Sequence, residues 1–229
     1  GKSVKISTFT LIVYFSWRMY QISGLLKFPK LFHAFSTKKD GNMANSILGK
    51  LTNFDEVLKN RRNFLERINI PINSCVCMWV MGSDGVEIAD REKMGKSMTD
   101  YKEAIKTDAL ITDQKGLYLF LLTADCAPVI IYDPTKEVVA LVHVGWKGAD
   151  LGVVKKVIKR LRELYKTKAE DLMVGIGPSA KAESFIKENP SQKEDPRWQA
   201  FLERLGKDKF KVDFVGFAKS QLIESGVPE

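Results

Sequence analysis

Residues 129–144, VIIYDPTKEVVALVHV, decide the fold, because they contain two apolar strands joined by a turn. An Asp-Pro pair opens the turn, as type I turns prefer. The fixed negative φ of proline excludes the primed two-residue turns. We therefore predict a hairpin with a four-residue loop, 133–136, that is closed by Tyr132 opposite Glu137.

Carried outward, this register places a thiol beside an imidazole. Cys126 falls opposite His143 on one face of the sheet, with the two Cβ atoms ~4.5–5.5 Å apart. The chain has only three cysteines and two histidines, and each type alone is typical of a buried structural position. Their pairing next to Asp125 and Gly145 predicts a functional site. A bulge near Pro128 would instead turn Cys126 to the other face.

The remaining pattern predicts an α+β fold, a layered sandwich with a mixed sheet and flanking helices. Asn53 has the character of an N-cap, and apolar residues at helical spacing follow it. Strands and helices alternate without regular βαβ units. The expected elements are helices at 54–67, 151–165, 196–205 and 213–225, and strands at 31–35, 75–81, 117–122 and 172–176.

Composition indicates an ordinary globular protein. The chain has 229 residues, 45% of them hydrophobic, and a net charge of +8. Such a length suits one large domain or two small ones, and we expect a single domain over 19–229. The positive charge permits an anionic partner, but aromatic residues are not interleaved with the basic ones, so we expect no nucleic-acid binding.

The first residues leave two interpretations open. The apolar run 9–17 is far shorter than a membrane span, and no small-residue cleavage site follows it. It is either a buried or edge strand, or part of an extension, 1–18, before a natural start at Met19. Three cysteines without a secretion signal favour a reducing compartment, and we expect a cytoplasmic protein without membrane contact.

Two segments carry a family resemblance. Residues 123–128 (TADCAP) followed by 142–148 (VHVGWKG) resemble the multicopper polyphenol oxidase, or laccase-domain, family, which is also called the peptidoglycan-editing-factor or purine nucleoside phosphorylase-type family. Weaker matches lie in the expected order at 33–38 (HAFSTK), 107–111 (TDALI) and 175–179 (GIGPS). The resemblance implies a single α/β sandwich of cysteine-hydrolase-like type with a Cys/His site in a surface cleft.

The resemblance also implies zinc bound by Cys126, His143 and a third residue that corresponds here to Met81. A neutral thioether is a poor zinc ligand, so we expect zinc to be weakly bound or absent. Copper is not expected, because multicopper chemistry needs many histidines. From the resemblance we also expect the family's C-terminal segment to be missing after Glu229. The family's arginines correspond to Lys38 and Lys147, which lack the bidentate fork.

Three functions follow from the resemblance and the residues. The first is phosphorolysis of inosine, adenosine or guanosine, with deamination of adenosine as a related activity that zinc would support. The second is a metal-free Cys–His hydrolase of amide or ester bonds, including peptidoglycan precursors. The third is a purine-binding protein without turnover. In each case we expect a monomer whose partners are small molecules, a purine nucleoside and phosphate.

Each candidate side chain has an expected role. Cys126 is a ligand or nucleophile, His143 a ligand or base, and Asp125 orients the imidazole. Lys38 and Lys147 bind an anion. The substrate-binding set is completed by Ser36 and by Trp146, which either stacks on a base or packs in the core.

Overall fold

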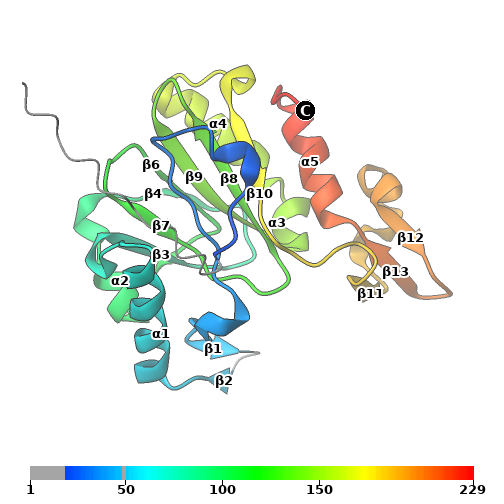
Figure 1. Ribbon diagram of the computed structural model, residues 1–229. Coiled ribbons are helices and arrows are strands. Elements are labelled where there is room, and N and C mark those ends of the chain that lie inside the picture. The colour runs from blue at the N-terminus through cyan, green and yellow to red at the C-terminus, as the bar shows by residue number, and fades with distance from the viewer. Residues whose placement is uncertain (1–18, 48–49) are drawn as a thin grey trace, which may run out of the picture.

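The computed structural model describes residues 19–47 and 50–229, so the apolar run 9–17 lies outside the described residues. A five-stranded mixed sheet in the order β10-β8-β9-β6-β4 forms its centre (Figure 1). Neighbouring strands are antiparallel except β6 and β4, which are parallel. The bounds are β4 Val86–Ile88, β6 Ala109–Thr112, β8 Ala127–Asp133, β9 Val138–Val144 and β10 Met173–Ile176.

The predicted hairpin is present as β8 and β9, but its register differs from the prediction by two residues. Asp133 pairs with Val138, so the four-residue loop is 134–137 rather than 133–136. The Asp133 carboxylate accepts hydrogen bonds from the backbone N–H groups of Thr135 and Lys136, at 2.8 and 2.9 Å, while Asp133 itself stays in the strand. Glu137 takes the left-handed turn position with a φ of 53°. A shift of two residues keeps every side chain on its predicted face.

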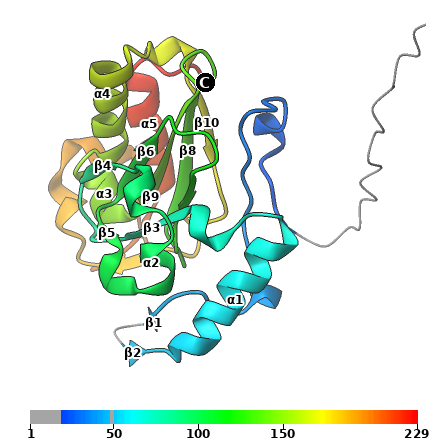
Figure 2. The same cartoon turned by 90° about the vertical axis from the view of Figure 1, so that its left-hand side faces the viewer.

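Three helices cover one face of this sheet: α3 Trp146–Asp150, α4 Val153–Tyr165 and α5 Phe214–Glu224. Figure 2 shows α4 and α5 on one side of the sheet and the N-terminal segment with α1 on the other. Val157 and Leu161 of α4 and Phe217 of α5 belong to the main core, together with every second residue of β9. The helix predicted over 151–165 is thus confirmed from Val153, and the separate short helix α3 precedes it.

The other face carries α1 Phe54–Arg67 and a parallel three-stranded sheet in the order β5-β3-β7. Its strands are β3 Cys75–Trp79, β5 Ile105–Lys106 and β7 Tyr118–Phe120. The predicted helix 54–67 is confirmed with its cap, because the Asn53 side chain accepts hydrogen bonds from the N–H groups of Asp55 and Glu56. Arg61 of α1 is fully buried and donates to the carbonyls of Met43 and Met98.

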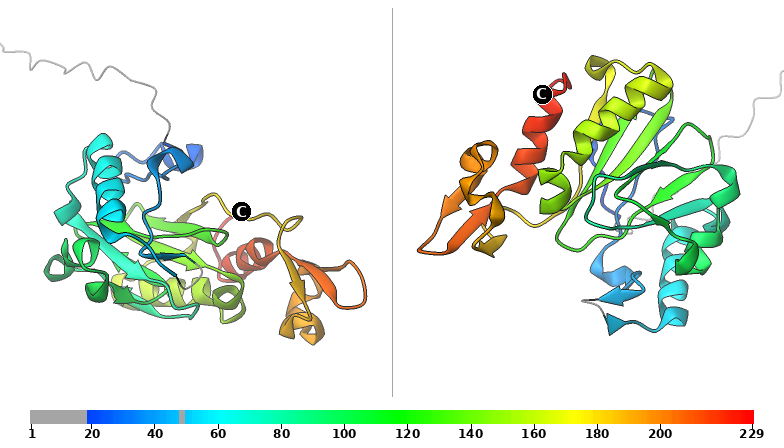
Figure 3. Two further views of the ribbon diagram at one scale, coloured as in Figure 1. Left: turned by 90° about the horizontal axis from the view of Figure 1, so that it is seen from below. Right: turned by 180° about the vertical axis from the view of Figure 1, so that it is seen from behind.

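A third sheet lies beside α5 at the edge of the molecule (Figure 3). It consists of β11 Ile186–Glu188, β13 Lys209–Val212 and β12 Leu202–Arg204, all antiparallel. The helix predicted at 196–205 is wrong: a 3-10 helix ends at Phe201 and β12 follows. The contacts of buried Trp198 determine the conformation of this segment. Its indole N–H donates to Asp150 at 2.8 Å, and its ring stacks on Phe217.

The strand predicted at 31–35 is also wrong. The segment makes a single bridge, between Phe35 and Tyr20, and otherwise crosses the face of the main sheet as irregular chain. Packing explains the apolar residue Phe35, since its ring lies against Gly177. A Cβ at Gly177 would lie 2.4 Å from Phe35 Cε1, so only glycine permits this approach.

The remaining elements are small. They are the two-stranded sheet of β1 Ser46–Ile47 and β2 Lys50–Leu51, the one-turn helix α2 Lys96–Thr99, and several 3-10 helices, including Lys38–Asp40. Among the residues described, no helix has both the length and the apolar character needed to cross a membrane.

Candidate active site

His143 lies near the end of β9, on the sheet face opposite α4. Its side chain is 10% exposed. The Nδ1 atom lies 2.8 Å from Oδ1 of Asp108, and the His143 backbone N–H donates to the Asp108 carbonyl at 2.7 Å. Because β6 pairs with β9 and Asp108 directly precedes β6, the sheet itself places the carboxylate against the imidazole.

The Asp108 carboxylate is fully buried and surrounded by donors. Oδ2 accepts from the Ser83 N–H at 2.7 Å, the Ser83 hydroxyl at 2.6 Å and the Met81 N–H at 3.2 Å. Oδ1 accepts from the Gly82 N–H at 3.0 Å as well as facing His143. Burial alone would raise the pKa of Asp108, but the hydrogen bonds from His143 and Ser83 outweigh it and lower the pKa to about 2.

The imidazole is cationic at neutral pH as a result. Burial would lower the pKa of His143, but the hydrogen bond to Asp108 and the contact with Cys126 outweigh burial and raise the pKa to about 9. With Nδ1 held by the carboxylate, Nε2 is the atom that can give a proton to a ligand.

Cys126 approaches the same imidazole across Gly145. It is half-buried, and it directly precedes β8. A Cβ on Gly145 would lie 3.0 Å from the Cys126 sulfur and 3.5 Å from His143 Cε1. Because glycine has no side chain, the thiol and the imidazole can both lie close to residue 145. The partner of His143 across the hairpin is Pro128, which makes Cys126 a diagonal neighbour of His143 rather than the directly opposed residue that the predicted register gave.

The orienting role expected of Asp125 is filled by Asp108. Asp125 is exposed, and its backbone carbonyl accepts a hydrogen bond from the Ala180 N–H at 2.9 Å. Sequence reasoning noted the segment 107–111 but assigned it no role. The missing signal was the pairing of strand 109–112 with β9, which aligns Asp108 with His143. Together, Cys126, His143 and Asp108 are the Cys–His–Asp site.

The predicted binding residues belong to two separate segments of the chain, 36–38 and 146–147. Lys147 is exposed, and its Cδ lies 3.8 Å from the Cβ position of Gly82, in the turn that holds Asp108. Trp146 packs partly against the main core, and the Lys187 ammonium lies 5.4 Å from its ring centre. Ser36 and Lys38 are exposed on the opposite segment, which crosses the sheet face.

The donors present do not fit the metals that the family resemblance implies. Cys126 and Nε2 of His143 provide two ligands, since Nδ1 is engaged by Asp108. Met81 is 54% exposed and offers only a thioether. No three His, Cys, Asp or Glu side chains in 19–47 and 50–229 are grouped to hold an ion. His33, the second histidine, has its Nε2 engaged by the Ile22 N–H at 2.8 Å.

Comparison with known proteins places the chain in a family. The sequence profile of the family described as multi-copper polyphenol oxidoreductase laccase matches residues 33–229. This chain belongs to that laccase family. Its fold is also that of two solved family structures, YfiH from Bacillus licheniformis and YlmD from Geobacillus stearothermophilus. The TM-scores are 0.73 and 0.72, each at 22% identity, and the alignments cover 81% and 82% of this chain and 72% and 71% of the others.

Several curated relatives in the laccase family carry the name purine nucleoside phosphorylase. The one from Bacteroides thetaiotaomicron is 29% identical over 92% of this chain and 83% of its own length. YlmD from Bacillus subtilis is 32% identical over 54% of this chain, and a Clostridium acetobutylicum relative is 46% identical over 35%. The chain spans only 45% and 34% of the lengths of those two relatives.

Proposed function

We propose that this chain catalyses the phosphorolysis of purine nucleosides at the Cys–His–Asp site. The observation that carries the proposal is the contact of 2.8 Å between Nδ1 of His143 and the buried carboxylate of Asp108, which raises the pKa of the imidazole and leaves Nε2 as a proton donor. The names of relatives across the laccase family support the choice of substrate.

Phosphorolysis needs an anion pocket and a proton donor. An oxygen of inorganic phosphate forms a bond to C1′ of the sugar while the bond from C1′ to the purine nitrogen breaks. The purine leaves with that electron pair and takes a proton, which Nε2 of His143 supplies. Asp108 keeps the proton on Nδ1 and stabilises the imidazolium before transfer. Lys38 and Lys147 attract the phosphate, and Ser36 and Trp146 contact the nucleoside.

A cysteine hydrolase is the second candidate, and the order of the three side chains favours it. A thiol beside an imidazole, whose far nitrogen is held by a carboxylate, is the arrangement that activates nucleophiles in acyl transfer. In that reaction the Cys126 sulfur bonds to the carbonyl carbon of an ester or amide, the leaving group takes a proton from His143, and water then releases the acid. Neither candidate routes a step through a metal.

Product analysis separates the candidates. The chain is incubated with inosine, adenosine or guanosine, with and without phosphate, and separately with an aryl ester. Phosphorolysis predicts free base and sugar phosphate only when phosphate is present. Ester cleavage without nucleoside turnover would replace the first proposal with the second. Conversion of adenosine to inosine would identify deamination, and saturable binding without any product would indicate a purine-binding protein.

A further inference from the structure

A cavity of about 680 Å³ lies against the main sheet, on the face opposite α4. Segment 31–44 forms one wall, and the end of α1 together with β7 forms the other. This volume lies in the range of pockets that bind small ligands, which is about 300–1,000 Å³. None of the roles assigned above uses the greater part of it.

The cavity and the Cys–His–Asp site share one sheet face. Along the hairpin, the cross-strand pairs on this face are Pro128 with His143 and Ile130 with Leu141. Pro128, Ile130 and Leu141 all line the cavity. Cys126 and His143 are not among the lining residues, but Pro128 pairs with His143, and Thr123 and Ala124, which also line the cavity, lie just before Cys126 in the chain. The site therefore adjoins this end of the cavity.

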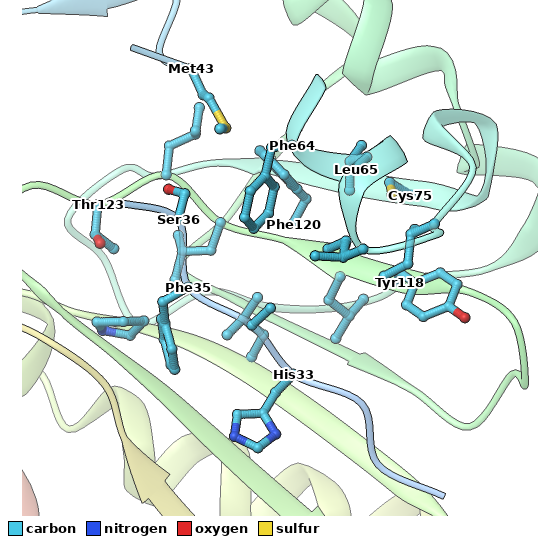
Figure 4. A pocket seen from close by; sticks show the side chains of 18 of the residues that line it. His33, Phe35, Ser36, Met43, Phe64, Leu65, Cys75, Tyr118, Phe120 and Thr123 are labelled. Carbon is cyan, nitrogen blue, oxygen red and sulfur yellow. The ribbon is translucent and has the colours of Figure 1, made fainter. Parts of the chain in front are cut away.

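The lining changes in character along the cavity. Figure 4 shows Ser36 and Thr123 together at one end, with the rings of Phe64 and Phe120 further in and Tyr118 at the far end. Thr123 is only three residues before Cys126, so the hydroxyl end is the end nearest the reacting groups. A ligand that fits has a polar part at this end and a flat apolar part between the rings.

We propose that this cavity binds the purine base of the substrate, with the sugar at Ser36 and Thr123 and its anomeric carbon facing Cys126 and His143. The inference rests on the proposed function for the identity of the ring. Bases stack on aromatic side chains through their faces, so Phe64 and Phe120 provide the contact that needs no particular hydrogen-bond pattern. The cavity therefore accepts several purines.

The test is calorimetric titration of inosine into the full chain and three variants. Phe120→Ala removes a ring from the wall. Ala44→Leu keeps every ring but fills part of the cavity, so it remains informative if Phe120→Ala does not fold. Phe28→Ala is the matched control, because Phe28 packs on Tyr132, with ring centres 5.8 Å apart, and is not among the lining residues.

We expect inosine to bind roughly ten- to a hundred-fold more weakly to Phe120→Ala, which is the worth of one stacking contact. Ala44→Leu should weaken binding more than two-fold, because its larger side chain takes up space in the cavity. Phe28→Ala binds as the unaltered chain does, and the KM for phosphate does not change in any variant. Affinities of both cavity variants within two-fold of the unaltered chain would overturn the inference. So would an unaltered chain that does not bind inosine.

Failure of the inference and failure of the proposed function look different. Phosphorolysis that persists with unchanged inosine affinity in both cavity variants removes the cavity assignment and leaves the function standing. Inosine binding that depends on Phe120 and Ala44, without phosphorolysis, supports the cavity and removes the function.

Discussion

Replacing Asp108 by asparagine should lower the pKa of the His143 imidazole, because it removes the carboxylate charge beside the ring. The carboxylate accepts hydrogen bonds from Met81, Gly82 and Ser83 as well as from His143, whereas an amide has a single oxygen. If that oxygen faces Ser83, the amide N–H groups face the donor of Gly82 and the imidazole. In Asp108→Asn the imidazole therefore loses both its partner charge and its acceptor.

The size of the effect follows from the pKa of His143. The rise from 6.5 to about 9 corresponds to about 3 kcal/mol at 1.36 kcal/mol for each pH unit. Because the folded pKa is raised, this stabilisation is fully present below pH 6.5 and is lost as the pH rises through about 9. Because the contact with Cys126 also raises this pKa, we expect Asp108→Asn to lose only part of this stabilisation at pH 6, at most about 3 kcal/mol, with a smaller difference at pH 10.

Proton NMR measures the pKa directly, because the chain has only two histidines. The His33→Gln variant assigns the two ring signals. In the unaltered chain one signal should titrate near pH 9, and that of His33 below 6.5, because burial lowers the pKa of His33. In Asp108→Asn the pKa of His143 should fall well below 9, although the contact with Cys126 still raises it. If it still titrated near 9, the carboxylate would not be the cause of the raised pKa, and the reasoning would be refuted.

Three further predictions test other parts of the structure. Iodoacetamide at pH 8 should alkylate half-buried Cys126 well before Cys75 and Cys77, because burial raises the thiol pKa values of Cys75 and Cys77 to about 12 and 11. Peptide mass spectrometry measures the extent of modification at each cysteine. Equal modification of all three cysteines would contradict this burial. Gly177→Ala should lower the free energy of unfolding by about 1–3 kcal/mol, because the new methyl group meets the Phe35 ring. Urea titration measures this change, with Gly206→Ala as the control because no atom other than those of its chain neighbours lies within 4 Å of the added methyl group there. Equal stability of the two variants would contradict the prediction. Met81→His should increase zinc affinity at least ten-fold by adding a third donor to Cys126 and His143; unchanged affinity in calorimetry would show that residue 81 does not reach the pair.

The hairpin shows what the sequence could predict and where local rules stopped. Two apolar runs joined by an Asp-Pro turn predicted β8 and β9, and the pairing register set by that turn assigned Cys126 and His143 to one face. The Asp-Pro pair also set the loop length, but not which residue took the left-handed position. In the structure Glu137 takes the left-handed position, and Asp133 caps the loop while remaining in the strand. The register therefore differs from the predicted one by two residues.

Asp108 shows more clearly what local sequence patterns cannot predict. Its role depends on which strand lies beside β9, and that choice is made by packing between segments distant in sequence. The same holds for 196–205, where the buried indole of Trp198 and its bond to Asp150 override a helical pattern. Helices 54–67 and 213–225 were predictable because their apolar spacing is local and their caps are nearby.

Phosphate-dependent release of hypoxanthine from inosine tests the central claim most directly when it is measured in three proteins side by side. These are the unaltered chain, His143→Gln, and Cys77→Ala as a control at a buried position outside the site. The account predicts a rate at least about a hundred-fold lower for His143→Gln, which is the usual worth of a positioned proton donor, and an unchanged rate for Cys77→Ala. A His143→Gln protein that released hypoxanthine as fast as the unaltered chain would contradict it.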